Sequence, residues 1–221
     1  MLSKGIKYLI PVMLLLSMSC HKSIDGNDDG DEQYYDLRNI SRTEDNSYQP
    51  TIAIDADGTV YVCWMESKGL FFRYRGADGE WSDIETIVDS GWGPDMVVDP
   101  LGNVHVVWEV HYWGNRICYR ERYEGGGWSE MRVISGTSAE QPRIGVDSSG
   151  VVHVVWIEGV GMKYRERHSD GSWSEEEAVP VGTQGSVNPD MVVERPVKKN
   201  VSDLILHSSL RYLKANICLI S

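Results

Sequence analysis

The segment from Glu109 to Asn115 has the sequence Glu-Val-His-Tyr-Trp-Gly-Asn and carries side chains that could hold a ligand. The rings of Tyr112 and Trp113 offer flat apolar faces on which a sugar ring can stack, and Glu109 and His111 can supply hydrogen bonds. A largely apolar surface with a few placed polar groups is typical of small-molecule sites. An aromatic loop that packs on its neighbour would have the same composition, so both interpretations stay open.

An internal repeat determines which elements carry this segment. A Pro followed 14 residues later by a Trp, with an Asp, a Gly and a Val at fixed positions between them, occurs three times. A repeat of about 20–50 residues indicates one supersecondary unit used several times. The copies run from Pro50 to Trp64, from Pro94 to Trp108 and from Pro142 to Trp156, and a fourth begins at Pro189, where Pro189 to Val193 repeats Pro94 to Val98 letter for letter.

Each copy is predicted to form four short antiparallel strands. An apolar strand ends at an Asp-x-x-Gly turn, and a continuously apolar strand such as Val-His-Val-Val-Trp follows, so both faces of this second strand should be buried. The third strand ends in Tyr-Arg at residues 74–75, 119–120 and 164–165, and a Gly-rich turn leads to Trp-Ser and the fourth strand. The pattern predicts an all-β fold of β-propeller blades, about three blades plus a closing strand, incomplete relative to a six- or seven-bladed ring.

The repeat also divides the chain into parts. We expect an export signal at residues 1–19, an acidic flexible linker at 20–34, a partial propeller at 35–193 and an atypical tail at 194–221. The blades are expected at about 50–93, 94–141 and 142–188, with a fourth starting at 189. The repeat pattern stops after Val193, for which a frameshift is the simplest explanation. Self-association that covers the open blade edges and a genuine partial propeller are the alternatives.

The N-terminal segment is typical of a targeting signal. Lys4 and Lys7 precede an apolar run from Tyr8 to Leu16 that is too short to span a bilayer as a helix. With the small residues before Cys20, the segment resembles a bacterial lipoprotein signal. The resemblance implies export, lipidation at Cys20 and a membrane anchor at the cell envelope or surface. Ordinary secretion and an uncleaved anchor are the alternatives.

Charge and metal-ligand spacing exclude some classes of partner. A formal net charge of −12 argues against a nucleic-acid surface, because such surfaces need clustered Lys and Arg. In the acidic linker, Asp25, Asn27 and Asp29 match the first positions of a calcium loop, but Asp36 replaces the usual final Glu and no helical pattern flanks them. We therefore expect no metal site and no cofactor.

Function in a propeller is expected where the copies differ, in the loops between the second and third strands and between blades. Residues that recur at one repeat position serve every blade alike, so we interpret His105 and His153 as packing side chains and the recurring strand-end arginines as solvated edges. The remaining candidates for ligand binding are Trp92, Asp95, Glu109, His111, Tyr112, Trp113, Glu140 and Arg143.

The turn before the fourth strand resembles a known motif. The sequence Ser169-Asp170-Gly171-Ser172-Trp173 is similar to the Asp-box of the sialidase-like propellers, also called the bacterial neuraminidase repeat, over residues 50 to about 193. The first copy has only Ala-Asp-Gly-Glu-Trp at residues 77–81, and the second has no Asp in its turn. The resemblance implies that these turn residues are structural and lie away from the functional face.

Several functions remain open. We expect a surface-anchored propeller that binds a ligand, with a glycan favoured. A sialidase-like exo-glycosidase is the alternative from the enzyme class, but it needs an arginine cluster for the substrate carboxylate, and Arg143 is one well-placed arginine. A scaffold for protein partners and a non-functional truncated product are further alternatives. Catalysis therefore remains uncertain, and we favour binding without it.

The cysteines allow two interpretations. Cys63 occupies the position that Val107 and Val155 fill in the other copies, which favours a small buried thiol. A bridge between Cys63 and Cys118 is the alternative in an oxidising compartment.

Overall fold

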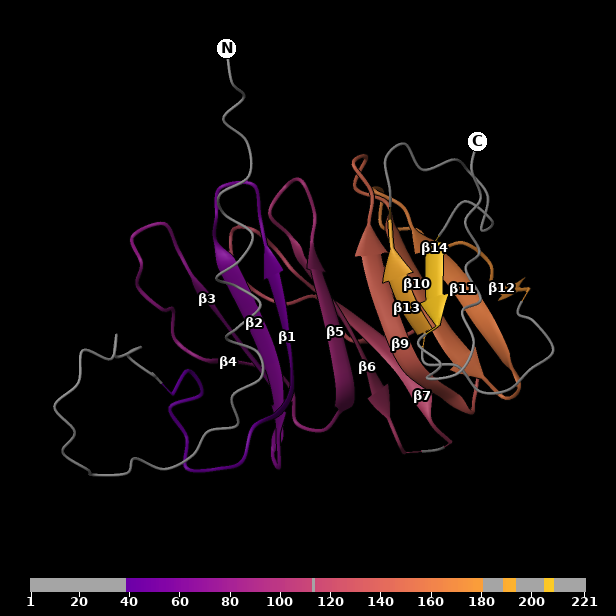
Figure 1. Cartoon of the computed structure of the whole chain (residues 1–221), viewed down its shortest axis with the longest axis horizontal. Helices are drawn as coiled ribbons and strands as arrows, with labels where there is room; N and C mark the ends of the chain where they lie inside the picture. Colours follow the sequence, from indigo (N-terminus) through magenta and orange to yellow (C-terminus); the bar gives the residue numbers. More distant parts are fainter. Residues whose placement is uncertain (1–38, 113, 181–188, 194–204, 209–221) are drawn as a thin grey trace, which may run out of the picture. The chain divides into compact units, whose positions relative to one another are not determined.

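The computed structural model describes residues 39–112, 114–180, 189–193 and 205–208 (Figure 1). This part of the chain consists of strands, turns and loops and contains no helix, so none of its segments is a helix that could cross a membrane. Two units, residues 1–44 and 45–221, are described separately. In the first, residues 39–41 belong to the segment 37–41 that was expected to be the closing strand, and they form a bend in which the Asn39 side chain accepts hydrogen bonds from the Ser41 amide and hydroxyl.

The second unit contains the predicted blades, each a four-stranded antiparallel sheet with its strands in sequence order (Figure 1). Blade 1 contains β1 (Tyr48–Ile54), β2 (Val60–Glu66), β3 (Gly69–Arg75) and β4 (Glu85–Val88). Blade 2 contains β5 (Trp92–Val98), β6 (Val104–Val110), β7 (Arg116–Arg122) and β8 (Arg132–Val133). Blade 3 contains β9 (Ala139–Val146), β10 (Val152–Glu158), β11 (Gly161–Arg167) and β12 (Glu177–Val179).

The first strands of successive blades contact one another, as expected for inner strands of a propeller. β1 contacts β5, and β5 contacts β9. β9 in turn contacts β13 (Pro189–Val192), which pairs antiparallel with β14 (Ile205–Ser208). The predicted fourth copy therefore continues as a strand pair, with β14 coming from the segment that was expected to be an atypical tail. The all-β propeller fold is confirmed.

The Asp-x-x-Gly turns form as the sequence predicts. In the first, the Asp55 carboxylate accepts hydrogen bonds from the amides of Asp57 and Thr59, and Gly58 has a φ of 86°, a conformation that favours glycine. Asp99 and Asp147 make the same two amide contacts in their turns. These turns join the first and second strands at the end of each blade opposite Tyr48 and Trp92.

The core lies between the blades, so the second strands are covered on both faces. Trp108 and Val106 pack with the blade 1 side chains Leu70 and Phe72, while Val107 on the same strand packs toward blade 3. All five side chains are fully buried. This arrangement explains why these strands are continuously apolar rather than alternating.

Both cysteines of this region are buried free thiols. Cys63 and Cys118 are inaccessible and belong to the core between blades 1 and 2. Burial raises the pKa of the Cys63 thiol and raises that of Cys118 to about 11. The interpretation as small core residues is confirmed, and the bridge is not formed.

The sequence repeat aligned the third strand of the first copy two residues away from its true position relative to the other two copies. In every blade a third-strand guanidinium donates to the Ser carbonyl of the Trp-Ser pair and lies over the Trp ring. The equivalent arginines are Arg73, Arg120 and Arg165, whereas the sequence paired Arg75 with the latter two. Nor are these strand ends solvated edges, because Arg73 and Glu121 are buried.

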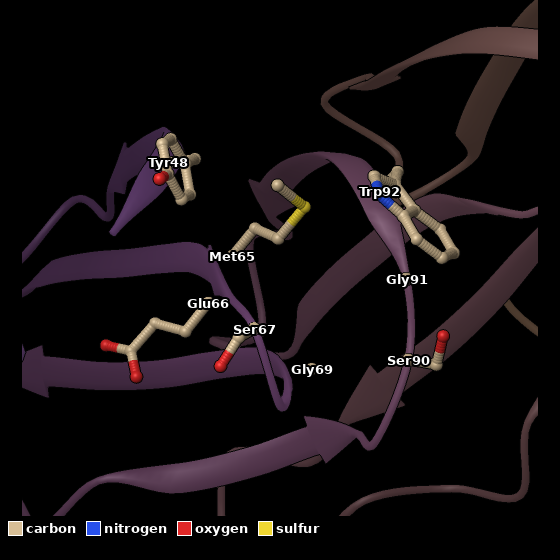
Figure 2. Close-up of a pocket in the computed structure, with 8 residues that line it drawn as sticks. All are labelled: Tyr48, Met65, Glu66, Ser67, Gly69, Ser90, Gly91 and Trp92. Carbon is tan, nitrogen blue, oxygen red and sulfur yellow. The ribbon is translucent and has the colours of Figure 1, made fainter. Parts of the chain in front are cut away.

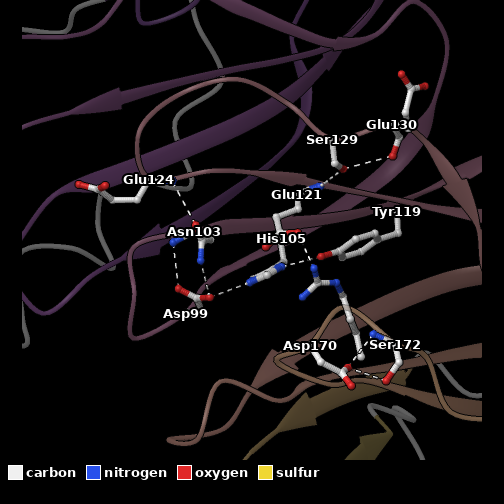
Figure 3. Close-up of polar contacts among 11 residues, drawn as sticks. Asp99, Asn103, His105, Tyr119, Glu121, Glu124, Ser129, Glu130, Asp170 and Ser172 are labelled. Carbon is white, nitrogen blue, oxygen red and sulfur yellow. Dashed lines mark hydrogen bonds and ion pairs between the residues drawn. The ribbon is translucent and has the colours of Figure 1, made fainter.

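The histidines of the second strands are buried packing residues, as predicted, and Figure 3 shows His105. His105 is fully buried, with Nδ1 2.7 Å from the Tyr119 hydroxyl and Nε2 3.3 Å from an Asp99 carboxylate oxygen. In blade 1, Tyr61 takes the same place and donates its hydroxyl to Asp55 at 2.8 Å. Blades 1 and 2 therefore tie their turn Asp to a ring in the core, whereas in blade 3 His153 Nε2 lies 3.7 Å from the Asp147 carboxylate.

We expect Asp99 to make stability depend on pH in the acid range. Burial opposes ionisation, but hydrogen bonds from His105 and Asn103 outweigh it and lower the pKa of Asp99 to about 2. A carboxyl with a lowered pKa stabilises the fold above its unfolded pKa of about 3.9, by about 2 kcal/mol here, and loses this contribution as the pH falls. The difference in unfolding free energy between wild type and Asp99→Asn should shrink from about pH 5 to about pH 2.

The control for this experiment is Asp57→Asn in the corresponding turn of blade 1. The Asp57 side chain is exposed, so its replacement should change the unfolding free energy little. An Asp99→Asn defect of the same size at both ends of the pH range would contradict the assigned role.

An indole nitrogen in blade 2 lacks the partner that its counterparts have. Trp64 Nε1 donates to Glu66 at 2.8 Å and Trp156 Nε1 donates to Glu158 at 3.1 Å. Trp108 Nε1 is buried without a hydrogen-bond partner within the described part of the chain, because Val110 occupies the position of the two glutamates. An unsatisfied buried donor destabilises a fold.

Val110→Glu is therefore expected to stabilise the protein. The new carboxylate should accept the Trp108 indole hydrogen and raise the unfolding free energy by about 1 kcal/mol, measured by urea denaturation. Val110→Met, which adds length without an acceptor, is the control. Equal changes in unfolding free energy for the two variants would show that the unpaired Trp108 indole nitrogen does not destabilise the protein.

Candidate ligand-binding site

A small pocket opens between blades 1 and 2, at the end opposite the Asp-x-x-Gly turns (Figure 2). Its volume is about 140 Å³. It is formed by the start of β1, the turn between β2 and β3, and the loop between β4 and β5. The lining residues are Tyr48, Met65, Glu66, Ser67, Gly69, Ser90, Gly91 and Trp92.

The aromatic walls of the pocket come from one repeat position in adjacent blades. Tyr48 and Trp92 each lie two residues before the Pro of their copy, and Tyr48 is 51% exposed. Each is followed by a residue with positive φ, Gln49 at 48° and Gly93 at 56°, and by a shift in strand register. The Gln49 side chain accepts the Gly93 amide hydrogen at 2.9 Å, which links the two strand starts across the blades.

The position of the Trp92 ring is fixed by contacts with His111 and, through it, with Glu109. The His111 ring stacks on the indole with centroids 4.3 Å apart and planes 5° apart. His111 Nε2 lies 3.1 Å from one Glu109 oxygen, and the other Glu109 oxygen accepts the Gln141 amide hydrogen of blade 3 at 2.7 Å. The indole is therefore fixed before any ligand arrives, which reduces the entropy lost on binding.

Polar groups surround the aromatic walls. The Tyr112 side chain is 56% exposed and its hydroxyl lies 3.2 Å from Ser90 Oγ. On the opposite side, Ser67 donates to Asp45, and this hydrogen bond holds the pKa of Asp45 below its usual value. Glu66 accepts hydrogen bonds from Trp64 Nε1 and from the Ser47 hydroxyl. Hydroxyls, amides and carboxylates thus lie around a partly apolar hollow.

The structure brings four of the predicted site residues together, namely Trp92, Glu109, His111 and Tyr112. Two others lie apart from the pocket and serve blade contacts. Glu140 accepts the Asn115 side-chain amide at 2.9 Å, and Asp95 accepts the Ile144 amide at 3.0 Å. Burial raises the pKa of Asp95.

Arg143 also lies outside the pocket and donates to the carbonyl of its neighbour Pro142 at 2.7 Å. The remaining predicted positions, Trp113 and the lipidation site Cys20, lie outside the described residues. Trp92 is therefore the predicted residue that lines the pocket, and Asp95 and Arg143 on the first strands of blades 2 and 3 do not line it.

Of the eight residues that line the pocket, the sequence interpretation named Trp92 alone. The seven lining residues that were not among the candidates are Tyr48, Met65, Glu66, Ser67, Gly69, Ser90 and Gly91. A signal for Tyr48 was present, because it occupies the same repeat position as Trp92. Trp92 was instead treated as lying outside the repeat, so its match with Tyr48 was not used.

A larger pocket of about 430 Å³ lies between the same blades at the opposite end. Its polar walls are already engaged within the protein. Asp55 and Asp99 accept the turn hydrogen bonds, and Arg122 is paired with Glu85. The smaller pocket, with its exposed aromatic rings, is the better candidate.

Comparison with known proteins gives the fold and little more. No protein-family model matches the chain, and no curated protein matches its sequence. Among solved structures, a mutant of the GH43 protein BlXynB from Bacillus licheniformis is similar with a TM-score of 0.51 and 11% identity over 73% of this chain. A xylan β-1,4-xylosidase from Bacillus halodurans has a TM-score of 0.45 and 12% identity over 73%. The lectin BP39L from Burkholderia pseudomallei has a TM-score of 0.45 and 16% identity over 58%.

The chain spans about two fifths of the length of these structures, 39% of each Bacillus protein and 41% of the lectin. At such identities the likeness concerns the backbone and not the residues of a site. Together with the three four-stranded antiparallel sheets, the similarity to the GH43 protein BlXynB shows that the chain has a β-propeller fold.

Proposed function

We propose that this chain binds carbohydrate in the pocket between blades 1 and 2. The observation that carries the proposal is the pair of partly exposed aromatic rings, Tyr48 and Trp92, that line one pocket from adjacent blades. A pyranose ring has an apolar face that suits an aromatic wall, and hydroxyls that suit a polar rim. Ser67, Ser90 and Tyr112 place hydroxyls around the two rings.

The pocket's size favours one sugar ring over an extended chain. Its volume of about 140 Å³ is below the roughly 300–1,000 Å³ of sites that enclose drug-sized ligands. A terminal sugar, or one ring of a glycan that otherwise projects into solvent, matches this size. Hydrogen bonds from a rigid rim would then select among epimers.

Binding fits this pocket better than hydrolysis. Glycosidases of the common mechanisms place two carboxyl groups on either side of the scissile bond. Among the described lining residues Glu66 is the single carboxylate, and it is buried in contact with Trp64 and Ser47. The sialidase-like alternative thus lacks residues here for the reaction.

A glycan array followed by calorimetry tests the proposal. The purified full chain should bind a subset of immobilised glycans, and the free terminal sugar should bind with a dissociation constant in the micromolar to millimolar range. Tryptophan fluorescence should change on binding, because Trp92 lines the pocket. Absence of binding to any neutral, amino or acidic glycan would exclude carbohydrate as the ligand and favour a protein-interaction scaffold.

The cellular setting is part of the same proposal. An exported chain anchored through lipid at Cys20 would present the pocket to glycans outside the cell, with the acidic segment 20–34 as a spacer. Mass spectrometry of the mature protein tests this, since lipidation adds acyl mass at Cys20. A mature N-terminus elsewhere, or an unmodified Cys20, would contradict the anchor without affecting the pocket.

A further inference from the structure

The junction between blades 2 and 3 repeats the construction of the junction that holds the pocket. We infer that it contains a second sugar-binding position, which the side chain of His111 occupies in this chain. The inference rests on the proposed carbohydrate binding and extends it from the first blade junction to the second.

Strand register makes the two junctions equivalent. Tyr48 lies opposite Met65 where β1 starts, and Trp92 lies opposite Glu109 where β5 starts. In both strands a register shift separates this pair from the rest of the ladder. The two aromatic rings therefore take the same place in their blades, and so do the hairpin residues two positions after Met65 and Glu109.

Those hairpin residues are Ser67 in blade 1 and His111 in blade 2. Ser67 has a short side chain that lines the pocket, and the Tyr48 ring, which also lines it, is 51% exposed (Figure 2). His111 is longer and lays its imidazole on the Trp92 indole, with centroids 4.3 Å apart and planes 5° apart. The imidazole thus covers an aromatic ring at the position where the first junction leaves Tyr48 open to a sugar.

A hydrogen bond between the blades is also repeated. At the first junction the Gln49 side chain accepts the Gly93 amide hydrogen at 2.9 Å, and at the second the Glu109 side chain accepts the Gln141 amide hydrogen at 2.7 Å. Gly93 and Gln141 each precede the Pro of their copy and have φ angles of 56° and 53°. The start of the following blade is therefore held by the same kind of contact at both junctions.

Polar atoms at the second junction lack partners. Arg116 starts β7 at the position that Gly69, a pocket-lining residue, takes in β3. Within the described part of the chain, Arg116 Nε and Gln141 Oε1 are buried and have no hydrogen-bond partner. Buried polar groups without partners destabilise a fold, and sugar hydroxyls both donate and accept hydrogen bonds. The hydroxyls of a bound ring match this donor and this acceptor.

The stoichiometry of sugar binding tests this inference on the full chain. The probes are the methyl glycosides of glucose, galactose, mannose, fucose, N-acetylglucosamine and N-acetylneuraminic acid, titrated by calorimetry. Wild type is expected to bind one sugar per chain. His111→Ser places the residue of the first junction in the second and should raise the stoichiometry to two, because it uncovers the Trp92 ring. The first site should then bind somewhat more weakly, since Trp92 loses its support.

Further variants assign each site. His168→Ser is the matched control, because His168 is 44% exposed against 43% for His111 but follows β11 at the opposite end of blade 3, and it should keep one site. Ser67→His should cover Tyr48 and weaken the first site by at least about tenfold, as loss of an aromatic wall does. Ser67→Ala, which removes the hydroxyl and leaves the pocket open, should retain binding. The double variant Ser67→His, His111→Ser should bind one sugar, at the second junction.

The outcomes separate this inference from the proposed function. One site in His111→Ser, with wild-type binding intact, would overturn the second position and leave the first pocket in place. Two sites in wild type would also overturn the inference, because His111 would then not close the second position. Binding by His111→Ser but not by wild type would support the second position and contradict the first. Failure of every probe to bind any of these proteins would remove both.

Discussion

Replacing Trp92 by Ala is expected to weaken carbohydrate binding by about 10- to 100-fold while leaving the fold intact. Trp92 forms one wall of the pocket and is held in place by the stacked His111 ring, so its loss removes a preorganised surface. Rigid aromatic anchors of this kind dominate binding energy at interfaces, at about 2 kcal/mol or more each. The measurement is the dissociation constant of the tightest sugar by calorimetry, with circular dichroism to confirm folding.

Two further variants make this result specific. Tyr123→Ala removes another exposed aromatic side chain, 47% accessible, at the turn after β7 on the opposite end of blade 2, and should leave binding unchanged. His111→Ala should weaken binding less than Trp92→Ala, because it removes the support of the ring and not the ring itself. If Trp92→Ala bound the sugar as tightly as wild type, the pocket assignment would be wrong.

Replacing Arg122 by Ala is expected to destabilise the protein by about 3 kcal/mol. Arg122 of blade 2 donates two hydrogen bonds to Glu85 of blade 1, at 2.9 and 2.8 Å, and its guanidinium lies 5.4 Å from the Phe72 ring and 5.2 Å from the Tyr74 ring. Its side chain is 11% exposed. Removal of one partner of a buried pair leaves the other charge uncompensated, which costs about 3–5 kcal/mol, and the lower figure applies because Glu85 is 28% exposed.

Urea denaturation of Arg122→Ala and of a charge-free double variant measures this contribution. The double variant Arg122→Met, Glu85→Gln removes both charges and keeps apolar volume between the blades, so it should recover part of the lost stability. The Trp128 indole, which donates to Glu85 at 2.8 Å in the native protein, can donate to the amide oxygen of the introduced glutamine. A loss below about 1 kcal/mol in Arg122→Ala would place this pair among ordinary surface ion pairs.

The blades were predictable because several signals agreed at each repeat. The fixed spacing of Pro, Asp, Gly and Trp marked the strand ends, and the Asp99 turn and the buried Trp108 strand formed where this pattern placed them. The burial of His105 and His153 as core residues also followed from their recurrence. A fold can be predicted from a single sequence when the local residue pattern and the repeat position indicate the same structure.

The alignment of the third strands and the contacts between blades were not predicted from the repeat. The match of the third strands failed because blade 1 has Phe72 where blades 2 and 3 have Tyr, so the Tyr-Arg pair at 74–75 attracted the wrong alignment. The spacing from Trp81 back to Arg73 is the same as that from Trp128 to Arg120, and it gives the correct match. The partners across blades, such as Arg122 with Glu85, depend on three-dimensional packing that no spacing encodes.

The candidate site also depended on how the repeat copies were compared. Loop differences indicated Trp92, Glu109, His111 and Tyr112, which the structure brings together, with Trp92 in the pocket wall. Tyr48 was missed because its match with Trp92 at the same repeat position was not used, although the inter-blade pocket draws on this position of two blades. In repeat proteins, a position that is aromatic in neighbouring copies can build a site at their junction.

A crystal structure of the chain with the tightest-binding sugar tests the central claim most directly. We expect the sugar ring to lie against Trp92 with Tyr48 on its other side, and its hydroxyls to contact Ser67, Ser90 or Tyr112. Density for the sugar at another place, such as the larger pocket beside Asp55 and Arg122, with the Trp92 pocket empty, would contradict the proposed site.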